Sequence, residues 1–110
     1  FTKQLSPEIK TTLFRIAQEG LTNIERHSGA SRVTIELVKR VDGVRMIISD
    51  DGVGFDVLRM DGRKNGFQGI GLRNMQERLE FHGGELTVWS SPDKGTVVEA
   101  RLPNSVLIED

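Results

Sequence analysis

The sequence predicts an α+β fold, a two-layer α/β sandwich in which helices cover one side of an antiparallel or mixed sheet. Apolar residues recur at helical spacing in two segments and alternate with polar residues in four others. The alternating segments form two pairs joined by turn signals, which is typical of antiparallel hairpins. Because each helical segment has a single apolar face, the two helices can cover one side of such a sheet.

The first helix is predicted from Ser6 to about His27. Ser6 is a hydroxyl N-cap, Pro7 suits the first helical position, and Glu8 places an acid in the first turn. Gly29 suits the C-terminal cap. The apolar face consists of Ile9, Leu13, Ile16, Ala17, Gly20 and Ile24.

A hairpin and a long loop follow this helix. Apolar residues alternate from Val33 to Leu37, which predicts a half-buried strand, and again from Val44 to Ile48. Asp42-Gly43 is the turn signal between the two strands. The stretch from Gly52 to Gly71 is rich in glycine and charge, and unstructured loops of that length are usually functional or mobile.

The second half of the chain repeats the order of helix and hairpin. A second helix is predicted with Leu72, Met75 and Leu79 on one face and Gly83-Gly84 at its end. Two strands then lead into and out of a turn at Pro92–Gly95. The domain is expected to cover residues 6–103. Residues 104–110 lack turn or pairing signals and are expected to form a loose C-terminal tail.

Composition excludes several classes of protein. The 110 residues make one domain, and a formal net charge of −1 gives no overall field to attract nucleic acid or an anionic membrane. The absence of cysteine excludes disulfide scaffolds and thiolate metal sites, and no apolar run is long enough to span a bilayer. We expect a cytoplasmic domain, excised from a longer protein that can itself be membrane-anchored, with no nucleic-acid partner and no direct membrane contact.

The first helix carries a polar stripe beside its apolar face. Glu19, Asn23, Arg26 and His27 follow one another at i, i+4, i+7 and i+8, so they share one side of the helix. An amide oxygen is a hard ligand for Mg²⁺, and the cationic groups can meet phosphate oxygens. An ordinary solvated helix face has the same pattern, so the stripe alone leaves both interpretations open.

Two further elements stand at strand ends. Asp50 closes an apolar strand, and Gly52 and Gly54 permit a sharp turn and the close approach of a flat ligand. A carboxylate at that place can accept a hydrogen bond from an exocyclic amine such as that of adenine, although Asp-Asp-Gly is also an ordinary acidic turn. Thr96 enters the last strand, where its hydroxyl can hold a ligand through water or simply favour the strand.

A glycine-rich segment directly precedes the second helix. Gly69 and Gly71 would expose backbone N–H groups at a helix N-terminus, where an anion is favoured, although a loop that merely caps the helix would look alike. The hairpins exclude a dinucleotide-binding βαβ unit, and no P-loop signature occurs.

These four elements, in this order, resemble the nucleotide-binding boxes of the ATPase superfamily shared by gyrase, heat-shock chaperone ATPases, MutL-type mismatch-repair proteins and histidine kinases. Phe14–His27 is similar to the N box of the nitrate-sensor-like histidine kinases, which pair with LuxR-type response regulators. Asp50–Phe55 resembles their G1 box, Gly69–Leu79 their G2 box with its helix, and Gly95–Pro103 their last strand. The resemblance covers almost the whole chain.

The resemblance implies a Bergerat-type ATP-binding fold with a long ATP lid between Phe55 and Gln68, and protein-histidine kinase activity with ATP and Mg²⁺. In that family Asp50 would bind the adenine amine with help from Thr96, Asn23 would hold Mg²⁺, and Glu19 would be the catalytic acid/base residue. The other nucleotide-binding positions implied are Arg26, His27, Gly52, Gly54, Gly69 and Gly71.

The resemblance also implies partners. The acceptor histidine of such kinases sits on separate dimerisation helices, and a LuxR-type response regulator is reached through the full-length kinase. His27 lies in the N box and His82 is expected to be a surface cap residue, so we expect ATP binding without self-phosphorylation. Two alternatives remain: an anti-sigma-factor serine kinase, and a nucleotide-binding module without catalysis.

Overall fold

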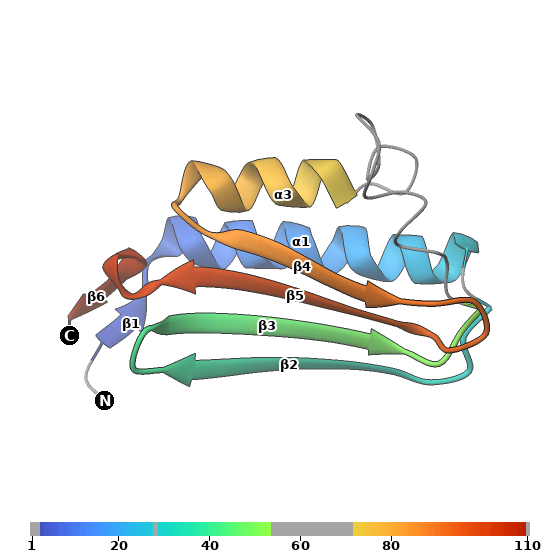
Figure 1. Cartoon of the computed structure of the whole chain (residues 1–110). Helices are drawn as coiled ribbons and strands as arrows, with labels where there is room; N and C mark the ends of the chain where they lie inside the picture. Colours follow the sequence, from blue (N-terminus) through green and yellow to red (C-terminus); the bar gives the residue numbers. More distant parts are fainter. Residues whose placement is uncertain (1–2, 28, 54–71, 110) are drawn as a thin grey trace.

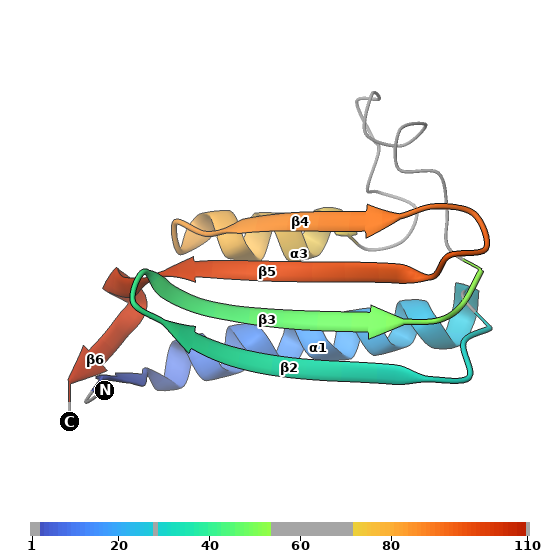
Figure 2. The same ribbon diagram turned by 60° about the horizontal axis from the view of Figure 1, so that its bottom comes forward.

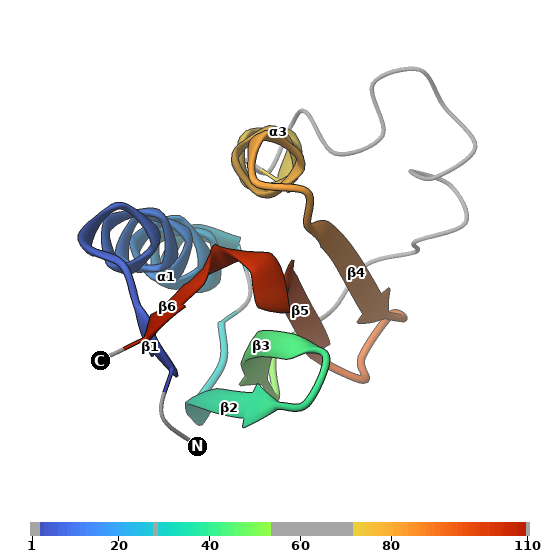
Figure 3. The same cartoon turned by 90° about the vertical axis from the view of Figure 1, so that its left-hand side faces the viewer.

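The computed structural model describes residues 3–27, 29–53 and 72–109, which form two layers (Figure 1). Helices α1 (Pro7–His27) and α3 (Leu72–Phe81) lie on the same side of a sheet and run in opposite directions. The end view in Figure 3 shows both helices above one face of that sheet. The predicted two-layer α+β fold is confirmed. Neither described helix is long and apolar enough to cross a membrane.

The sheet has the order β2-β3-β5-β4, and each pair of neighbouring strands is antiparallel (Figure 2). Within the described residues it is therefore antiparallel and not mixed. The strands are β2 (Val33–Arg40), β3 (Gly43–Asp50), β4 (Glu85–Ser90) and β5 (Thr96–Pro103). Both hairpins that the turn signals predicted are present.

Local signals set the helix ends where the sequence predicted them. At the start of α1, the Ser6 hydroxyl accepts a hydrogen bond from the Ile9 N–H at 3.2 Å. At the end of α3, Gly83 has a φ of 79° and the Gly84 N–H donates to the Leu79 carbonyl at 2.7 Å. This is the six-to-one bond of a Schellman cap, which needs a residue that tolerates positive φ.

His82 connects the two helices and is not the surface cap residue that the sequence predicted. Its side chain is only 14% exposed, and Nε2 lies 3.2 Å from the Thr12 hydroxyl and 3.8 Å from a Glu8 carboxylate oxygen. The end of α3 is thereby joined to the first turns of α1.

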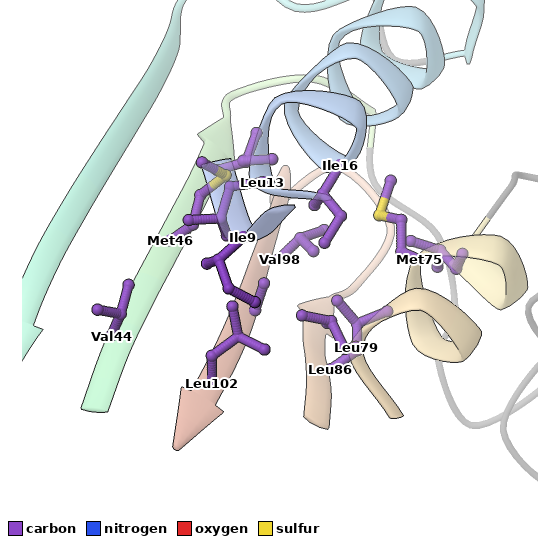
Figure 4. Close-up of a cluster of buried hydrophobic side chains, with 13 residues drawn as sticks. Ile9, Leu13, Ile16, Val44, Met46, Met75, Leu79, Leu86, Val98 and Leu102 are labelled. Atoms are coloured by element: carbon purple, nitrogen blue, oxygen red, sulfur yellow. The ribbon is translucent and has the colours of Figure 1, made fainter. Parts of the chain in front are cut away.

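The hydrophobic core lies between the helices and the sheet (Figure 4). Ile16 of α1 and Met75 and Leu79 of α3 are almost completely buried, so the apolar faces of both helices meet over the strands. The other buried apolar residues are Ile9, Leu13, Val44, Met46, Ile48, Leu72, Leu86, Val98, Ala100 and Leu102. Burying this surface is the main favourable contribution to folding.

Strand β2 is not half-buried, which corrects the prediction from its alternating pattern. Ile35 and Leu37 pair with the buried residues Ile48 and Met46, so they face the helix side. Yet Val33, Ile35 and Leu37 remain 37–49% exposed. The physical reason is that β2 is the edge strand and α1 packs on its neighbour β3, which the pattern of a single strand cannot reveal.

The prediction of a loose tail is wrong for residues 104–109. A 3-10 turn, η2 (Asn104–Val106), leads into strand β6 (Leu107–Glu109), which pairs antiparallel with β1 (Lys3–Leu5). The Asn104 N–H also donates to the Asp42 carbonyl at 3.1 Å. Strands of three residues are too short to show alternation, and these two come from opposite ends of the sequence.

Candidate functional site

The end of β3 and the start of β5 place three polar side chains in a row. The register pairs Asp50 with Thr96, and Thr96 with Ser90 of β4. Directly opposite residues share one face, and Ile48, two residues before Asp50, is buried on the helix side. Ser90 donates to the Gly95 carbonyl at 2.9 Å, so the contact of 2.8 Å between the two hydroxyls is a donation from Thr96. The Thr96 oxygen keeps its lone pairs.

The Asp50 carboxylate is held in one orientation. Its Oδ1 accepts a hydrogen bond from the Gly52 N–H at 2.8 Å, which closes a tight turn directly after β3. Within the described part of the chain, Oδ2 has no hydrogen-bond donor. The arrangement therefore presents one fixed, charged acceptor at the end of the strand.

The turn between β4 and β5 packs against the backbone of Asp50 and of the residues that follow it. Gly95 has a φ of 76°, and a Cβ built on it would overlap the Asp50 carbonyl oxygen. The Asp93 N–H donates to the Val53 carbonyl in the segment that follows. Only glycine combines this backbone conformation with so close an approach of two chains.

Helix α1 brings its polar stripe to the same end of the sheet. Gly20 packs on β3 so closely that an added Cβ would lie 2.8 Å from Ile48 Cδ1. Because α1 and β3 run in the same direction (Figure 1), Asn23 lies about 4.5 Å beyond Gly20 and Asp50 about 6.6 Å beyond Ile48. Asn23 and Glu19, one turn earlier, are both half-buried.

An open pocket of about 330 Å³ lies between α1 and α3. Ile16 and Met75 are its apolar residues, and both are buried in the core. The polar residues that line it are Arg15, Gln18, Glu19, Thr22, Asn74 and Arg78. Glu19 therefore faces a cleft between the helices, while Asn23, one turn nearer to Asp50, does not line it.

Comparison with known proteins shows the family. Residues 8–106 match the family described as "Histidine kinase-, DNA gyrase B-, and HSP90-like ATPase". The chain belongs to this family. It is 45% identical over 105 residues to the sensor histidine kinase MctS of Rhizobium johnstonii, and 40% identical over 95 residues to the sensor protein VraS of Staphylococcus aureus. These matches cover 96% and 86% of this chain, but only 22% and 26% of the relatives.

A solved structure agrees with the sequence relatives. The crystal structure of the ATP binding domain of PrrB from Mycobacterium tuberculosis matches with a TM-score of 0.66 at 27% identity. The match covers 84% of this chain and 67% of that one. Together with the sensor-kinase relatives, this makes the chain an ATP-binding catalytic domain of the sensor histidine kinase type.

Several positions predicted for this ATPase domain lie outside the described residues. Gly54, Gly69 and Gly71 fall there, as does the segment predicted to be the ATP lid. Arg26 and His27 complete helix α1, but their side chains are likewise outside the description. The structure therefore describes the side chains of Glu19, Asn23, Asp50 and Thr96, and the backbone of Gly52.

Among the described residues, Asn23 is the one predicted to hold Mg²⁺. Among them there is no group of three or more His, Asp or Glu side chains able to hold a metal ion. Mg²⁺ in nucleotide sites keeps several waters and takes one or two protein oxygens together with phosphate oxygens. The amide oxygen of Asn23 can be such a single protein ligand.

The sequence analysis missed Asp51. Its Oδ1 accepts hydrogen bonds of 2.9 Å from the N–H groups of Arg32 and Ser31, and its Oδ2 accepts one of 3.0 Å from the Ser31 hydroxyl. The bonds from the Arg32 amide and the Ser31 hydroxyl hold the pKa of Asp51 below its usual value of 3.8. Asp51 thus ties the segment after α1 to the end of β3. The Asp-Asp pair at a strand end was the only signal of this role.

Proposed function

We propose that this domain binds Mg·ATP and donates the γ-phosphoryl group to a histidine on a separate dimerisation domain. The observation that carries the proposal is the arrangement around Asp50. A carboxylate oriented by Gly52, with one oxygen left for a ligand, stands at the same end of the sheet as the α1 stripe with Asn23 and Glu19. One nucleotide can reach both groups.

Each described residue has a distinct role in this proposal. Asp50 Oδ2 accepts a hydrogen bond from the adenine amine, and Thr96 supports the ring through a water. Asn23 provides the protein ligand of Mg²⁺, which neutralises phosphate charge when bound. The side chains of Arg26 and His27 are assigned to the phosphates, and Gly52, Gly54, Gly69 and Gly71 to the close approach of backbone to the nucleotide.

Glu19 acts on the acceptor. It orients the incoming imidazole and takes its N–H proton as the other ring nitrogen attacks the γ-phosphorus. The new N–P bond forms while the bond from phosphorus to the bridging oxygen breaks, and ADP leaves with that oxygen. The contribution of the domain is mainly the positioning of these groups and the neutralisation of charge.

The partners follow from the sensor-kinase relatives. The domain works with dimerisation helices that carry the acceptor histidine, and a LuxR-type response regulator receives the phosphoryl group through the full-length kinase. The reaction takes place in the cytoplasm, where ATP is available. We propose no nucleic-acid partner for this domain.

Transfer with labelled ATP tests the proposal. The purified domain should retain no acid-labile label alone and should label a phosphoacceptor domain added in trans. ATP binding without transfer to that acceptor would favour a nucleotide-binding module, and label on a protein serine would favour a serine kinase. Acid-labile label retained on the domain itself would contradict the assignment of a separate acceptor.

A pair of α1 variants tests the metal role. Asn23→Ala should weaken the Mg²⁺-dependent part of ATP binding while adenosine binding changes little, because adenosine has no phosphates to share the ion. Glu25→Gln is the matched control, since Glu25 is exposed on the same helix and has no assigned role. Equal losses of ATP and adenosine affinity in Asn23→Ala, measured by calorimetry, would remove the metal assignment.

A further inference from the structure

The pocket between α1 and α3 contains two arginines that the nucleotide site does not use. Arg15 comes from α1 and Arg78 from α3, and both side chains are exposed. In the described part of the chain neither arginine has a carboxylate within ion-pair distance. By contrast, Nε of Arg73, which lies on α3 like Arg78, is 3.0 Å from Oε1 of Glu77. Two guanidinium groups with no ion-pair partner among the described residues thus line one cleft, one from each helix.

Among the described residues that line the pocket, the one acidic residue is Glu19, to which the proposed function gives the acid/base role. This described lining has a formal charge of +1, from two arginines and one glutamate. Its other polar side chains, Gln18, Thr22 and Asn74, are neutral. The cleft suits a segment that carries carboxylates as well as the group on which Glu19 acts.

The order of residues along α1 gives the direction of approach. Asn23, Glu19 and Arg15 follow at intervals of four residues, or about 6 Å each, away from the end where Asp50 lies. In-line transfer requires the acceptor to attack from the side opposite the leaving ADP. A nucleotide bound between Asp50 and Asn23 leaves the far side of Glu19 for the acceptor, and the pocket lies on that side.

We propose that this pocket receives the acceptor segment during transfer, and that Arg15 and Arg78 position it by pairing with acidic side chains near the acceptor histidine. The inference rests on the proposed function and adds the docking surface to it. Arginine suits this role because its planar group pairs with a carboxylate through two parallel hydrogen bonds. Both residues are positioning residues, since neither acts on the phosphorus.

Charge reversal tests the proposal. Arg15→Glu and Arg78→Glu are assayed for transfer from labelled ATP to the phosphoacceptor domain of a kinase of this family, such as MctS, over a range of acceptor concentrations. Each should raise the half-saturating acceptor concentration about tenfold or more, because a favourable contact becomes a like-charge contact. The affinity for ATP should stay within about twofold, since a distant charge acts weakly through water.

Arg73→Glu is the matched control. It makes the same charge change on α3, at an exposed residue outside the pocket, and should leave the half-saturating acceptor concentration unchanged. Arg15→Lys and Arg78→Lys should recover part of the loss, because the charge returns without the planar pairing geometry. Circular dichroism on each variant checks that the helices have formed.

Three outcomes would overturn the inference. Loss of ATP affinity in the reversed variants would make the arginines phosphate ligands. Unchanged acceptor dependence would show that the acceptor docks elsewhere, and an equal effect of Arg73→Glu would show that only the overall charge matters.

If the wild-type chain binds ATP but transfers nothing, the proposed function fails. Calorimetric binding of the acceptor domain to wild type and Arg78→Glu then decides the docking surface separately, and equal affinities would refute it.

Discussion

The assignment of Asp50 as the adenine-binding residue predicts a change of base preference in Asp50→Asn. In the wild type, Oδ1 accepts the Gly52 N–H at 2.8 Å and Oδ2 is left to accept the adenine amine. Asparagine can keep the first bond with its own Oδ1. Its NH₂ group then occupies the position of Oδ2, so a donor faces the amine donor of adenine.

The expected size follows from the bond that is lost. A hydrogen bond to a charged group contributes about 1.5–3 kcal/mol, which corresponds to a loss of about 10- to 150-fold in ADP affinity. A 6-oxo purine such as hypoxanthine presents an acceptor where adenine presents its amine. The variant should therefore bind IDP better than the wild type does, and its preference for ADP over IDP should shrink or reverse.

Calorimetric titration with Mg·ADP and Mg·IDP measures both effects. Asp51→Asn is the matched control, because it makes the same chemical change at the next residue, whose carboxylate faces the Ser31 and Arg32 amides. That variant should keep the preference for adenine. Unchanged ADP affinity in Asp50→Asn, or the same change of preference in both variants, would refute the reasoning.

Three further predictions concern stability. Leu79→Ala should lower the free energy of unfolding by about 2–5 kcal/mol in urea titrations, because Leu79 is fully buried, whereas Phe81→Ala, at an 80% exposed residue, should change it by less than about 0.5 kcal/mol. Gly95→Ala should lower the free energy of unfolding more than Gly29→Ala does. Both glycines have positive φ, so alanine at either place brings a backbone strain of about 1–3 kcal/mol. At Gly95 the added Cβ would also overlap the Asp50 carbonyl, whereas at Gly29 it would meet open space. The pKa of Asp51 in the folded chain lies below 3.8, so its contribution to stability is present above pH 3.8 and is lost as the pH falls through the folded pKa. Asp51→Asn should therefore flatten the fall of Tm in acid. Identical profiles of Tm against pH for the variant and the wild type would show that this carboxylate does not contribute to stability.

The parts of the fold that were predicted correctly depend on local chemistry. Ser6 caps α1 with its own side chain, the Asp42-Gly43 signal marks the first hairpin, whose two turn residues are Val41 and Asp42, and Gly83 adopts the positive φ that closes α3. Each of these signals acts within a few residues, so the sequence shows it directly. The burial of strand β2 was predicted wrongly, because alternation shows only which side chains share a face and does not show what covers that face.

Some residues of the candidate site could likewise be predicted from the sequence, and others could not. Asp50, Asn23, Glu19 and Thr96 could be predicted as site residues because their residue types and spacing resemble those of a known ATPase family. Asp51 was missed because its bonding partners come from the loop between α1 and β2, about twenty residues earlier.

By itself, the sequence determined the helices, the hairpins, the two-layer class and the family, because turn chemistry and apolar period are properties of neighbouring residues. Only the tertiary structure decided the strand order, the β1–β6 pair, the close contact between Gly95 and the Asp50 backbone, and the cleft that Arg15 and Arg78 both line. These features join residues far apart in the chain. Their positions result from how two helices pack on one sheet, which no local pattern encodes.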